Sequence, residues 1–585
     1  MTSCLSVCLL VALLVVVVPR CLCAFNLTIL HTNDVHARYE QTNKYSSPCA
    51  DKDVRRQACF GGYARLVTKV KEFRAKRPNN TLVLDAGDQY QGTYWFYVYG
   101  GNVTSTFMNW LGYDAMSFGN HEFDRNIVGL VDPFLKKINF PILSANLDSS
   151  KEPTMQGTYN KSTVLIRQGR KIGIVSYITP TTKGISHPGN LIFNPEIPAV
   201  QAEVNKLKRE GVDIIIALGH SGFTMDKRIA QEVDGVDVVI GGHTNTFLYT
   251  GDPPSNEKPK GPYPLVFQKA GKDPVLVIED YAYAKYLGHI ELEFNDTGTL
   301  TSWSGNPILL DSTVTQDQNT LDMMEPWKQG VEVKAKEVLG STNVFLQGDQ
   351  EFCRRLECNM GNFITDGLVD FYMKKRGDAE QWSTVAIAIM NGGGIRSNID
   401  PGDINMETLL TVQPFMNTIE RIQLKGEHVL GALEHSVHAY STDPNSDLFG
   451  GFLQMSGMKV VYDVSKPPQH RVVEVKVRCT KCDVPQFEPL NLTQIYDIIL
   501  PDFTANGGDD YTVIKKNKID TPKTGYMDSN VFRKYLEKMT PVTIGLEGRI
   551  TFVDGTKKVC TSGEVSTSST PSFIAFILIC AVYLI

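Results

Sequence analysis

Five short polar segments, each placed directly after an apolar and β-branched run, constrain this chain more than any other feature of its sequence. In chain order they are Asp34-Val35-His36, Gly87-Asp88, Gly119-Asn120-His121-Glu122-Phe123-Asp124, Gly219-His220 and Gly241-Gly242-His243. One such segment alone is typical of a polar loop, because Asn, Asp and His favour turns through local hydrogen bonds. Five of them in this order indicate strands that end repeatedly beside one functional site.

The residues between these segments predict an α/β layered domain over residues 25–313. Strands are expected at 26–30, 81–84, 172–177, 213–218 and 236–240, and apolar residues spaced three and four apart predict helices at 63–76 and 200–210. Such alternation favours parallel or mixed sheets covered by helices. Ligand-binding groups gather beyond the carboxyl ends of parallel strands, which is where all five segments lie.

The chain of 585 residues is too long for a single core, so at least two domains are expected. The pattern at 316–339 predicts one long helix, and the range 314–341 is assigned as a linker helix. Residues 342–553 are expected to form a second, smaller α/β domain with its own glycine-rich loops. The net charge of −6 offers no basic surface, so nucleic acid is not expected as a partner.

Both ends of the chain carry targeting patterns. The apolar run within residues 1–24 is too short to span a bilayer and predicts a cleaved signal peptide. Residues 554–585 combine small residues, a Ser/Thr-rich spacer and an apolar tail, which is the pattern of a glycosylphosphatidylinositol (GPI) attachment signal. Ser562 is the expected attachment residue. The protein is therefore expected at the extracellular face of the plasma membrane.

Cysteines and glycosylation sequons agree with a secretory route. Three sequence-local cysteine pairs suit disulfides in an oxidising compartment: Cys49/Cys59, Cys353/Cys358 and Cys479/Cys482. The last pair forms a Cys-x-x-Cys motif that could also bind zinc, although no second such motif completes a four-thiolate site. Six Asn-x-Ser/Thr sequons are expected to be glycosylated: Asn26, Asn79, Asn102, Asn160, Asn295 and Asn491. Cys560 has no expected partner.

The five segments supply the oxygen and imidazole ligands that a pair of divalent ions needs for phosphate chemistry. Asp34 and His36 are expected to bind the first ion, with Asp88 as the carboxylate shared between the two. The remaining candidates are amides and imidazoles: Asn120, His220 and His243 for the second ion, and Asn245 as a further oxygen near the first. Each histidine alone could be an ordinary loop residue, whereas the complete set predicts a two-metal centre.

These motifs resemble those of the calcineurin-like metallophosphoesterases. Strings in the second half narrow the resemblance to the 5′-nucleotidase family, most closely to its animal ecto-enzymes: Gly361-Asn362, Asn391-Gly392-Gly393-Gly394-Ile395-Arg396 and Phe503-Thr504-Ala505-Asn506-Gly507-Gly508-Asp509. The resemblance covers nearly the whole chain from Phe25 onward. It implies an N-terminal sandwich of mixed sheets flanked by helices, a linker helix and a smaller C-terminal α/β domain that binds the nucleotide.

The resemblance also implies individual roles. The two ions would be zinc, His121 would stabilise the transferred phosphoryl group, and Asp124 would orient its imidazole. In the second domain, phosphate and ribose would be bound by Arg354, Asn391 and Arg396, the base by Phe415 and Phe503, and the ribose hydroxyls by Asp509. In one departure from the family pattern, this chain has Leu356 where relatives often have arginine, and carries Arg355 instead.

The implied reaction is the hydrolysis of nucleoside 5′-monophosphates, chiefly AMP, to nucleoside and phosphate. Because the metal ligands lie in one domain and the base-binding residues in the other, the substrate would bridge an interdomain cleft that closes by rotation of the second domain. Two alternatives stay open: an apyrase that acts on ATP and ADP, and a catalytically silent binding protein of the same fold. A homodimer is a further expectation from the family.

Overall fold

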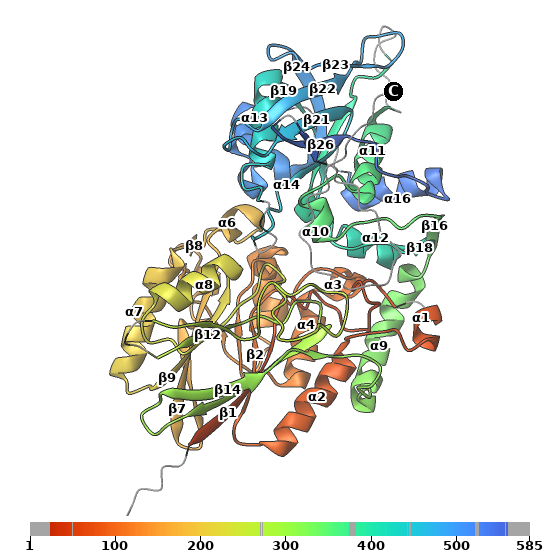
Figure 1. The fold of residues 1–585 in the computed structure, drawn as a ribbon. Helices are drawn as coiled ribbons and strands as arrows, with labels where there is room; N and C mark the ends of the chain where they lie inside the picture. The colour runs from red at the N-terminus through yellow and green to blue at the C-terminus, as the bar shows by residue number, and fades with distance from the viewer. Residues whose placement is uncertain are drawn as a thin grey trace, which may run out of the picture.

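The structure, a computed structural model, describes residues 24–559 except 50, 270, 272, 374–381, 416, 442, 444, 445, 521–525 and 556. Figure 1 shows two domains stacked one above the other, with helix α9 (Gln318–Ala335) along one side of the lower, N-terminal domain. Residues 1–23 of the expected signal peptide, Cys560 and Ser562 lie outside the described residues. Within the described ranges, no helix is both long enough and apolar enough to cross a bilayer.

The N-terminal domain contains two mixed sheets, as predicted. The first has the order β14 (Leu300–Gly305), β13 (Tyr286–Phe294), β1 (Phe25–Thr32), β2 (Thr81–Asp85), β3 (Ala115–Ser117) and β4 (Ile142–Leu143), with β15 (Ile308–Leu309) paired to β13. The second has the order β11 (Leu265–Phe267), β12 (Val275–Ile278), β10 (Val238–Ile240), β9 (Ile214–His220), β7 (Arg170–Ile178) and β6 (Ser162–Arg167). The predicted strands are confirmed, with ends that differ by one or two residues.

The alternation of side chains along each strand places a core on both faces of the first sheet. From β1, Leu27 and Ile29 pack between the two sheets, whereas Leu30 faces a second core under the helices. That second core is covered by α2 (Tyr63–Lys76), α3 (Tyr94–Tyr99), α4 (Gly101–Leu111) and α9, while α7 (Glu196–Arg209) and α8 (Phe223–Glu232) cover the second sheet. The domain is thus a sandwich of sheets flanked by helices (Figure 1).

The linker helix is shorter than the sequence predicted. Helix α9 ends at Ala335, and strand β16 (Val338–Thr342) begins inside the range that was assigned to the helix. The prediction was wrong there because β16 pairs antiparallel with β18 (Gly402–Asn405), so tertiary hydrogen bonds override local helix propensity. Helix α9 is held to the N-terminal domain, where the Tyr99 hydroxyl donates to the Trp327 carbonyl at 2.8 Å.

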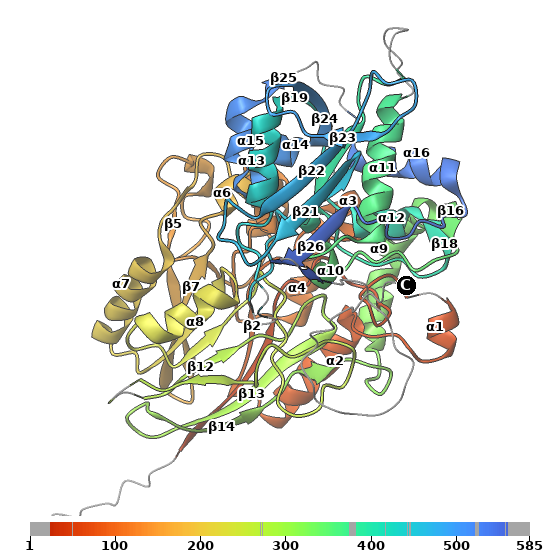
Figure 2. The ribbon, with the colours of Figure 1, turned by 45° about the horizontal axis from the view of Figure 1, so that its top comes forward.

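The C-terminal domain contains two further sheets. One has the order β20 (Leu453–Ser456), β17 (Ile387–Asn391), β24 (Ile495–Pro501), β19 (Ile419–Lys425) and β25 (Ile519–Asp520). The other has the order β23 (Phe487–Pro489), β22 (Val472–Arg478), β21 (Met458–Asp463), β26 (Ile550–Asp554) and β27 (Lys557–Val559). Helices α11 (Asn359–Met373) and α16 (Asp528–Met539) contact each other, and α13 (Gly426–Ser436) covers the core between the sheets (Figure 2).

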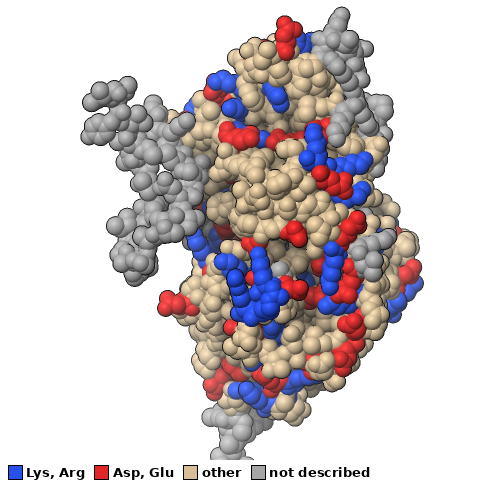
Figure 3. Space-filling view, turned by 90° about the vertical axis from the view of Figure 1, so that its right-hand side faces the viewer, with Lys and Arg blue, Asp and Glu red and all other residues tan. Residues whose placement is uncertain are grey.

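The three predicted disulfides are present, joining Cys49 to Cys59, Cys353 to Cys358 and Cys479 to Cys482. All of the predicted sequon asparagines are exposed except Asn295, which is partly buried. Their glycosylation stays a prediction. On the face shown in Figure 3, lysine and arginine side chains lie among aspartates and glutamates over both domains, as expected from a net charge of only −6.

Candidate active site

The five polar segments meet at one edge of the N-terminal domain. Strands β1, β2 and β3 run parallel in the first sheet, and β9 and β10 run parallel in the second. Their carboxyl ends bring together all six predicted metal ligands: Asp34, His36, Asp88, Asn120, His220 and His243. Four of the six have the positive φ angles, between 50° and 79°, that non-glycine residues adopt mainly in functional loops: Asp34, His36, Asp88 and His243.

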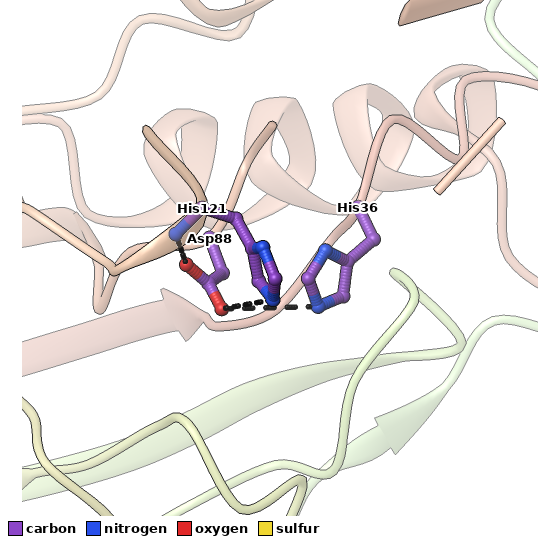
Figure 4. A group of neighbouring side chains, drawn as sticks. All are labelled: His36, Asp88 and His121. Atoms are coloured by element: carbon purple, nitrogen blue, oxygen red, sulfur yellow. Dashed lines mark hydrogen bonds and ion pairs between the residues drawn. The ribbon is translucent and has the colours of Figure 1, made fainter. Parts of the chain in front are cut away.

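Asp88 lies at the centre of this group and is 2% exposed. Its Oδ2 is 3.0 Å from His220 Nε2, and 3.9 Å from both His36 Nε2 and His121 Nε2. Its Oδ1 accepts a hydrogen bond from the backbone N–H of His121 at 2.8 Å, which fixes the carboxylate (Figure 4). A carboxylate held in this way, with imidazole nitrogens on several sides, has the geometry of a ligand shared by two ions.

Two of the imidazoles are oriented by backbone carbonyls. His36 Nδ1 donates to the carbonyl of Tyr90 at 2.9 Å, and His220 Nδ1 donates to the carbonyl of Ala86 at 2.7 Å. Each ring therefore directs Nε2 toward Asp88. A hydrogen bond of this kind fixes the tautomer and the direction of a metal-binding histidine.

The donor set fits a pair of divalent ions. Several buried polar atoms have no hydrogen-bond partner among the described residues, and two of them are acceptor oxygens of predicted ligands: Asp34 Oδ1 and Asn245 Oδ1. Asn120 Oδ1 lies 2.8 Å from His243 Nδ1, so two predicted ligands of the second ion are adjacent. Buried acceptors without donors are costly unless a cation binds them. Carboxylate, amide and imidazole groups together suit zinc and similar ions.

Burial and neighbouring charges together set the charge of these ligands. Burial lowers the pKa of His243 to about 3 and that of His36 well below its usual value, so both rings are neutral, the form that binds metal. Burial opposes ionisation of Asp88, but His220 and His121 hold the pKa of Asp88 well below its usual range. The same holds for His220, because Asp88 and Asp34 outweigh burial and raise its pKa to about 10. An ion at the site has to displace that proton.

Glu122 lies within the polar segment 119–124, but no role was predicted for it from the sequence. Its buried carboxylate accepts hydrogen bonds from the backbone N–H groups of Gly119 at 2.6 Å, Asp88 at 3.0 Å and Gln89 at 2.9 Å. These hydrogen bonds therefore connect the loop after β2 to the loop after β3. In the sequence, the position of Glu122 between the catalytic candidates His121 and Asp124 was the indication of a role. Only the fold shows which backbone amides its carboxylate binds.

His121 and Asp124, the predicted catalytic pair, are joined by a hydrogen bond. His121 Nδ1 donates to Asp124 Oδ2 at 2.7 Å, and the two side chains are about equally buried. Two residues for which the sequence predicted no role also donate to Asp124, namely Gln91 at 3.1 Å and Ser186 at 2.7 Å. Gln91 lies in the segment after β2, whereas no pattern in the sequence around Ser186 marked it.

Two arginines of the second domain face the metal ligands. Arg396 Nη2 lies 3.2 Å from His36 Nε2, and its guanidinium carbon lies 5.5 Å from the centre of the Phe415 ring. Arg354 Nε is buried without a hydrogen-bond partner in the described chain. Burial, followed by the charge of Arg396, lowers the pKa of Arg354 to about 10. Two guanidinium groups that lie close together favour a bound anion, and their fork geometry suits phosphate.

The predicted nucleoside-binding residues are only partly assembled. Asn391 Nδ2 donates to Asp509 Oδ2 at 2.9 Å, and burial raises the pKa of Asp509 to about 6. Phe503 packs against Gly508, where an added Cβ would lie 2.5 Å from its ring. Phe415 instead stacks on His121, with ring centroids 5.2 Å apart. In the described chain, no ring contact joins Phe415 to Phe503.

Arg355 does not take the place of an arginine at position 356. Its Nη2 donates to the carbonyl of Asp443 at 3.3 Å and to the hydroxyl of Ser446 at 3.2 Å. Leu356 packs against the core of the second domain. Arg355 thus contacts Asp443 and Ser446, and the two guanidinium groups of Arg354 and Arg396 stay the predicted phosphate-binding pair.

Two mixed sheets with divalent-metal ligands at a shared edge define a calcineurin-like metallophosphoesterase, and the protein is a metal-dependent phosphoester hydrolase. The family model "Calcineurin-like phosphoesterase" matches residues 27–247, and the model "5'-nucleotidase, C-terminal domain" matches residues 338–516. The chain belongs to the 5′-nucleotidase family. The 5′-nucleotidases of Bos taurus and Homo sapiens are each 47% identical to it over 538 residues, which are 91% of this chain and 92% of each relative.

Solved structures agree with this assignment. The 5′-nucleotidase precursor from Thermus thermophilus superimposes with a TM-score of 0.81 at 35% identity, covering 90% of this chain and 99% of that one. The similarity extends over both domains, so the fold as well as the sequence motifs belongs to the family.

Proposed function

We propose that the protein hydrolyses nucleoside 5′-monophosphates, chiefly AMP, to nucleoside and phosphate. The observation that carries the proposal is the 3.2 Å approach of Arg396, from the nucleotide domain, to the predicted metal ligand His36. A phosphate bound by Arg396 would lie beside the metal ligands. The guanidinium group and the metal ions would then act on the same phosphate group.

Each residue has a distinct task in this proposal. Two divalent ions, when bound, would supply Lewis-acid stabilisation of the phosphate oxygens, and zinc is the metal to test first. Arg354 and Arg396 bind the phosphate and restrain its rotation. His121 donates a hydrogen bond to the oxygen on which charge develops as the ester bond breaks, and Asp124 accepts from His121 Nδ1 so that Nε2 faces the substrate.

The second domain selects the nucleoside. Phe503 and Phe415 would stack on the two faces of the base, while Asp509 accepts hydrogen bonds from the ribose hydroxyls. With base and ribose held in the second domain, the distance from the nucleoside to the predicted metal ligands is fixed. A monophosphate then presents its only phosphorus to the ions, whereas a longer polyphosphate has to bend or shift its base.

The proposal includes a location and an assembly. A signal peptide, six sequons and a GPI signal at Ser562 support the extracellular face of the plasma membrane. The three local disulfides suit the same oxidising compartment. A phosphatidylinositol-specific phospholipase should release the protein from cells, and retention after treatment would argue against the anchor.

A homodimer is proposed from the family, and sedimentation of the released protein tests it.

Phosphate release from AMP, ADP and ATP tests the function. We expect AMP to give the highest kcat/KM in the presence of zinc and a chelator to abolish turnover. If ADP or ATP reacts as fast as AMP, the protein is an apyrase. If the zinc-loaded protein binds AMP without hydrolysing it, the protein is a silent binding protein.

A further inference from the structure

Asp124 accepts hydrogen bonds from three side chains on three segments of the chain. Its Oδ2 accepts from His121 Nδ1 at 2.7 Å and from Gln91 Nε2 at 3.1 Å, and its Oδ1 accepts from the Ser186 hydroxyl at 2.7 Å. Side-chain exposure of Asp124 is only 11%. Both oxygens are therefore engaged, and the plane of the carboxylate is determined by its partners.

Ser186 follows a short helix, α6 (Thr182–Ile185), which is anchored to the metal-binding edge. The backbone N–H of Thr179 donates to the carbonyl of His220 at 2.9 Å. The Thr182 hydroxyl donates to the carbonyl of Thr179 at 2.7 Å, and the Ser186 N–H donates to the carbonyl of Thr182 at 3.2 Å. The segment thus runs from a predicted metal ligand to Asp124 through continuous hydrogen bonds.

The same helix also contacts the second domain. Helix α6 touches η5 (Gly508–Asp510), the turn that contains the ribose-binding candidate Asp509. Figure 1 shows α6 at the top of the lower domain, directly beneath the upper one. One short segment therefore contacts the nucleotide-binding turn on one side and bonds to Asp124 on the other.

The torsion about the last bond of an aspartate side chain is broad and roughly two-fold, so a carboxylate with a single partner can rotate. The bond from Ser186 to Oδ1 removes that freedom and leaves Oδ2 directed at His121. Small displacements of a catalytic group lower the rate more than they weaken substrate binding, because alignment counts mainly in the transition state.

We propose that Ser186 is a positioning residue for the hydrolytic step, acting through Asp124 to align His121. The proposal deepens the proposed function and rests on the roles assigned there to His121 and Asp124. Because α6 also contacts η5, the segment that holds Asp124 lies beside the nucleotide-binding turn of the second domain.

Ser186→Ala, Ser186→Thr, Asp124→Asn and the double variant Ser186→Ala/Asp124→Asn test the proposal in the full chain loaded with zinc. Rates are measured with AMP and with 4-nitrophenyl phosphate, which needs no nucleoside recognition. Ser456→Ala is the matched control, because Ser456 donates a similar 2.6 Å bond to Asp366 in the second domain, away from the site. Thermal unfolding of each variant separates a loss of activity from a loss of folding.

We expect Ser186→Ala to lower kcat for AMP by roughly 10-fold with KM changed less than about 2-fold. Ser186→Thr should restore most of the rate, since it keeps the hydroxyl. In the Asp124→Asn background, Ser186→Ala should have no further effect, because the two residues act as one unit. The Ser456→Ala control should keep the wild-type rate.

Three results would overturn the role of Ser186: an unchanged kcat in Ser186→Ala, failure of Ser186→Thr to restore the rate, or a full multiplicative loss in the double variant. A different result tests the proposed function itself. If Asp124→Asn keeps the wild-type rate, the roles of His121 and Asp124 are wrong and Ser186 has no role through them. If AMP is not hydrolysed, the rates with 4-nitrophenyl phosphate still decide the role of Ser186.

Discussion

The ring of Phe415 stacks on the imidazole of His121, with centroids 5.2 Å apart and ring planes at 17° to each other. Phe415 belongs to the second domain and His121 to the first, so this contact joins the proposed base-binding surface to the proposed catalytic residue. A nucleotide cannot occupy the space between the two rings while they are stacked. A base bound between Phe415 and Phe503 would therefore have to stack on the opposite face of Phe415.

Phe503→Ala tests the proposed base clamp. We expect kcat/KM for AMP to fall by an amount equivalent to about 1–3 kcal/mol, the range for losing one aromatic stack on a base, mostly through KM. Phe487→Ala is the control, since Phe487 is 40% exposed on β23. Steady-state kinetics of phosphate release measure the effect. An unchanged kcat/KM in Phe503→Ala would remove Phe503 from the clamp.

Asp88→Asn tests the shared metal ligand. The amide keeps the shape of the side chain but loses the negative charge, so the ions bind weakly and turnover should fall by more than the roughly 10–100-fold typical of changes outside the ligand set. Bound zinc per chain and kcat are the measurements. Asp132→Asn, at a side chain 63% exposed, should change neither. A variant that lost its zinc but kept full activity would contradict the two-metal proposal.

Asp124→Asn should change the pH dependence of the reaction. Burial alone would lower the pKa of His121, but the carboxylates of Asp124 and Asp88 outweigh it and raise that pKa. Removing the charge of Asp124 lowers the pKa of His121, so the protonated imidazole is lost at a lower pH. The alkaline limb of the kcat/KM profile should then move to lower pH. An unmoved limb would mean that His121 does not act in its protonated form.

A buried pair of carboxyl groups behind the His243 loop predicts a stability that depends on pH. A Cβ added to Gly241 would lie 2.0 Å from Asp226 Oδ2 and 3.0 Å from Glu279 Cγ, so both side chains meet there. Burial is the main cause that raises the pKa of Asp226 to about 8 and the pKa of Glu279 well above its usual value. The folded protein then holds more protons than the unfolded chain between about pH 4 and 8, and its stability falls as the pH rises through that range.

Glu279→Gln should relieve this loss, because an amide donates a hydrogen bond to Asp226 without needing a proton. We expect the variant to raise the Tm by about 2–4 °C at pH 8.5, as a gain of ~1 kcal/mol would. At pH 5.5, where the carboxyl pair keeps its proton, the gain should be smaller. Calorimetry at the two pH values checks the prediction, and an equal gain at both would rule out protonation of the carboxyl pair as its cause.

The sequence predicted which residues meet at the proposed metal site because these residues follow strands directly. Asp34, Asp88 and His220 each lie at or just beyond the end of an apolar run, and parallel strands end at the same edge of a sheet. Their meeting therefore followed from local patterns alone. The three disulfides were predictable for a similar reason, since each joins cysteines that are at most 10 residues apart.

Other features were decided only by tertiary structure. The end of α9 depended on a distant strand, β18, that supplied hydrogen bonds to β16. Ser186 reaches Asp124 across 62 positions of sequence, and Phe415 meets His121 only because two separately folded domains come into contact. A sequence pattern reports which face of an element is apolar and where that element ends. Which distant side chain completes a hydrogen bond depends on how whole layers and domains pack, because burial and hydrogen bonding over the entire fold decide it.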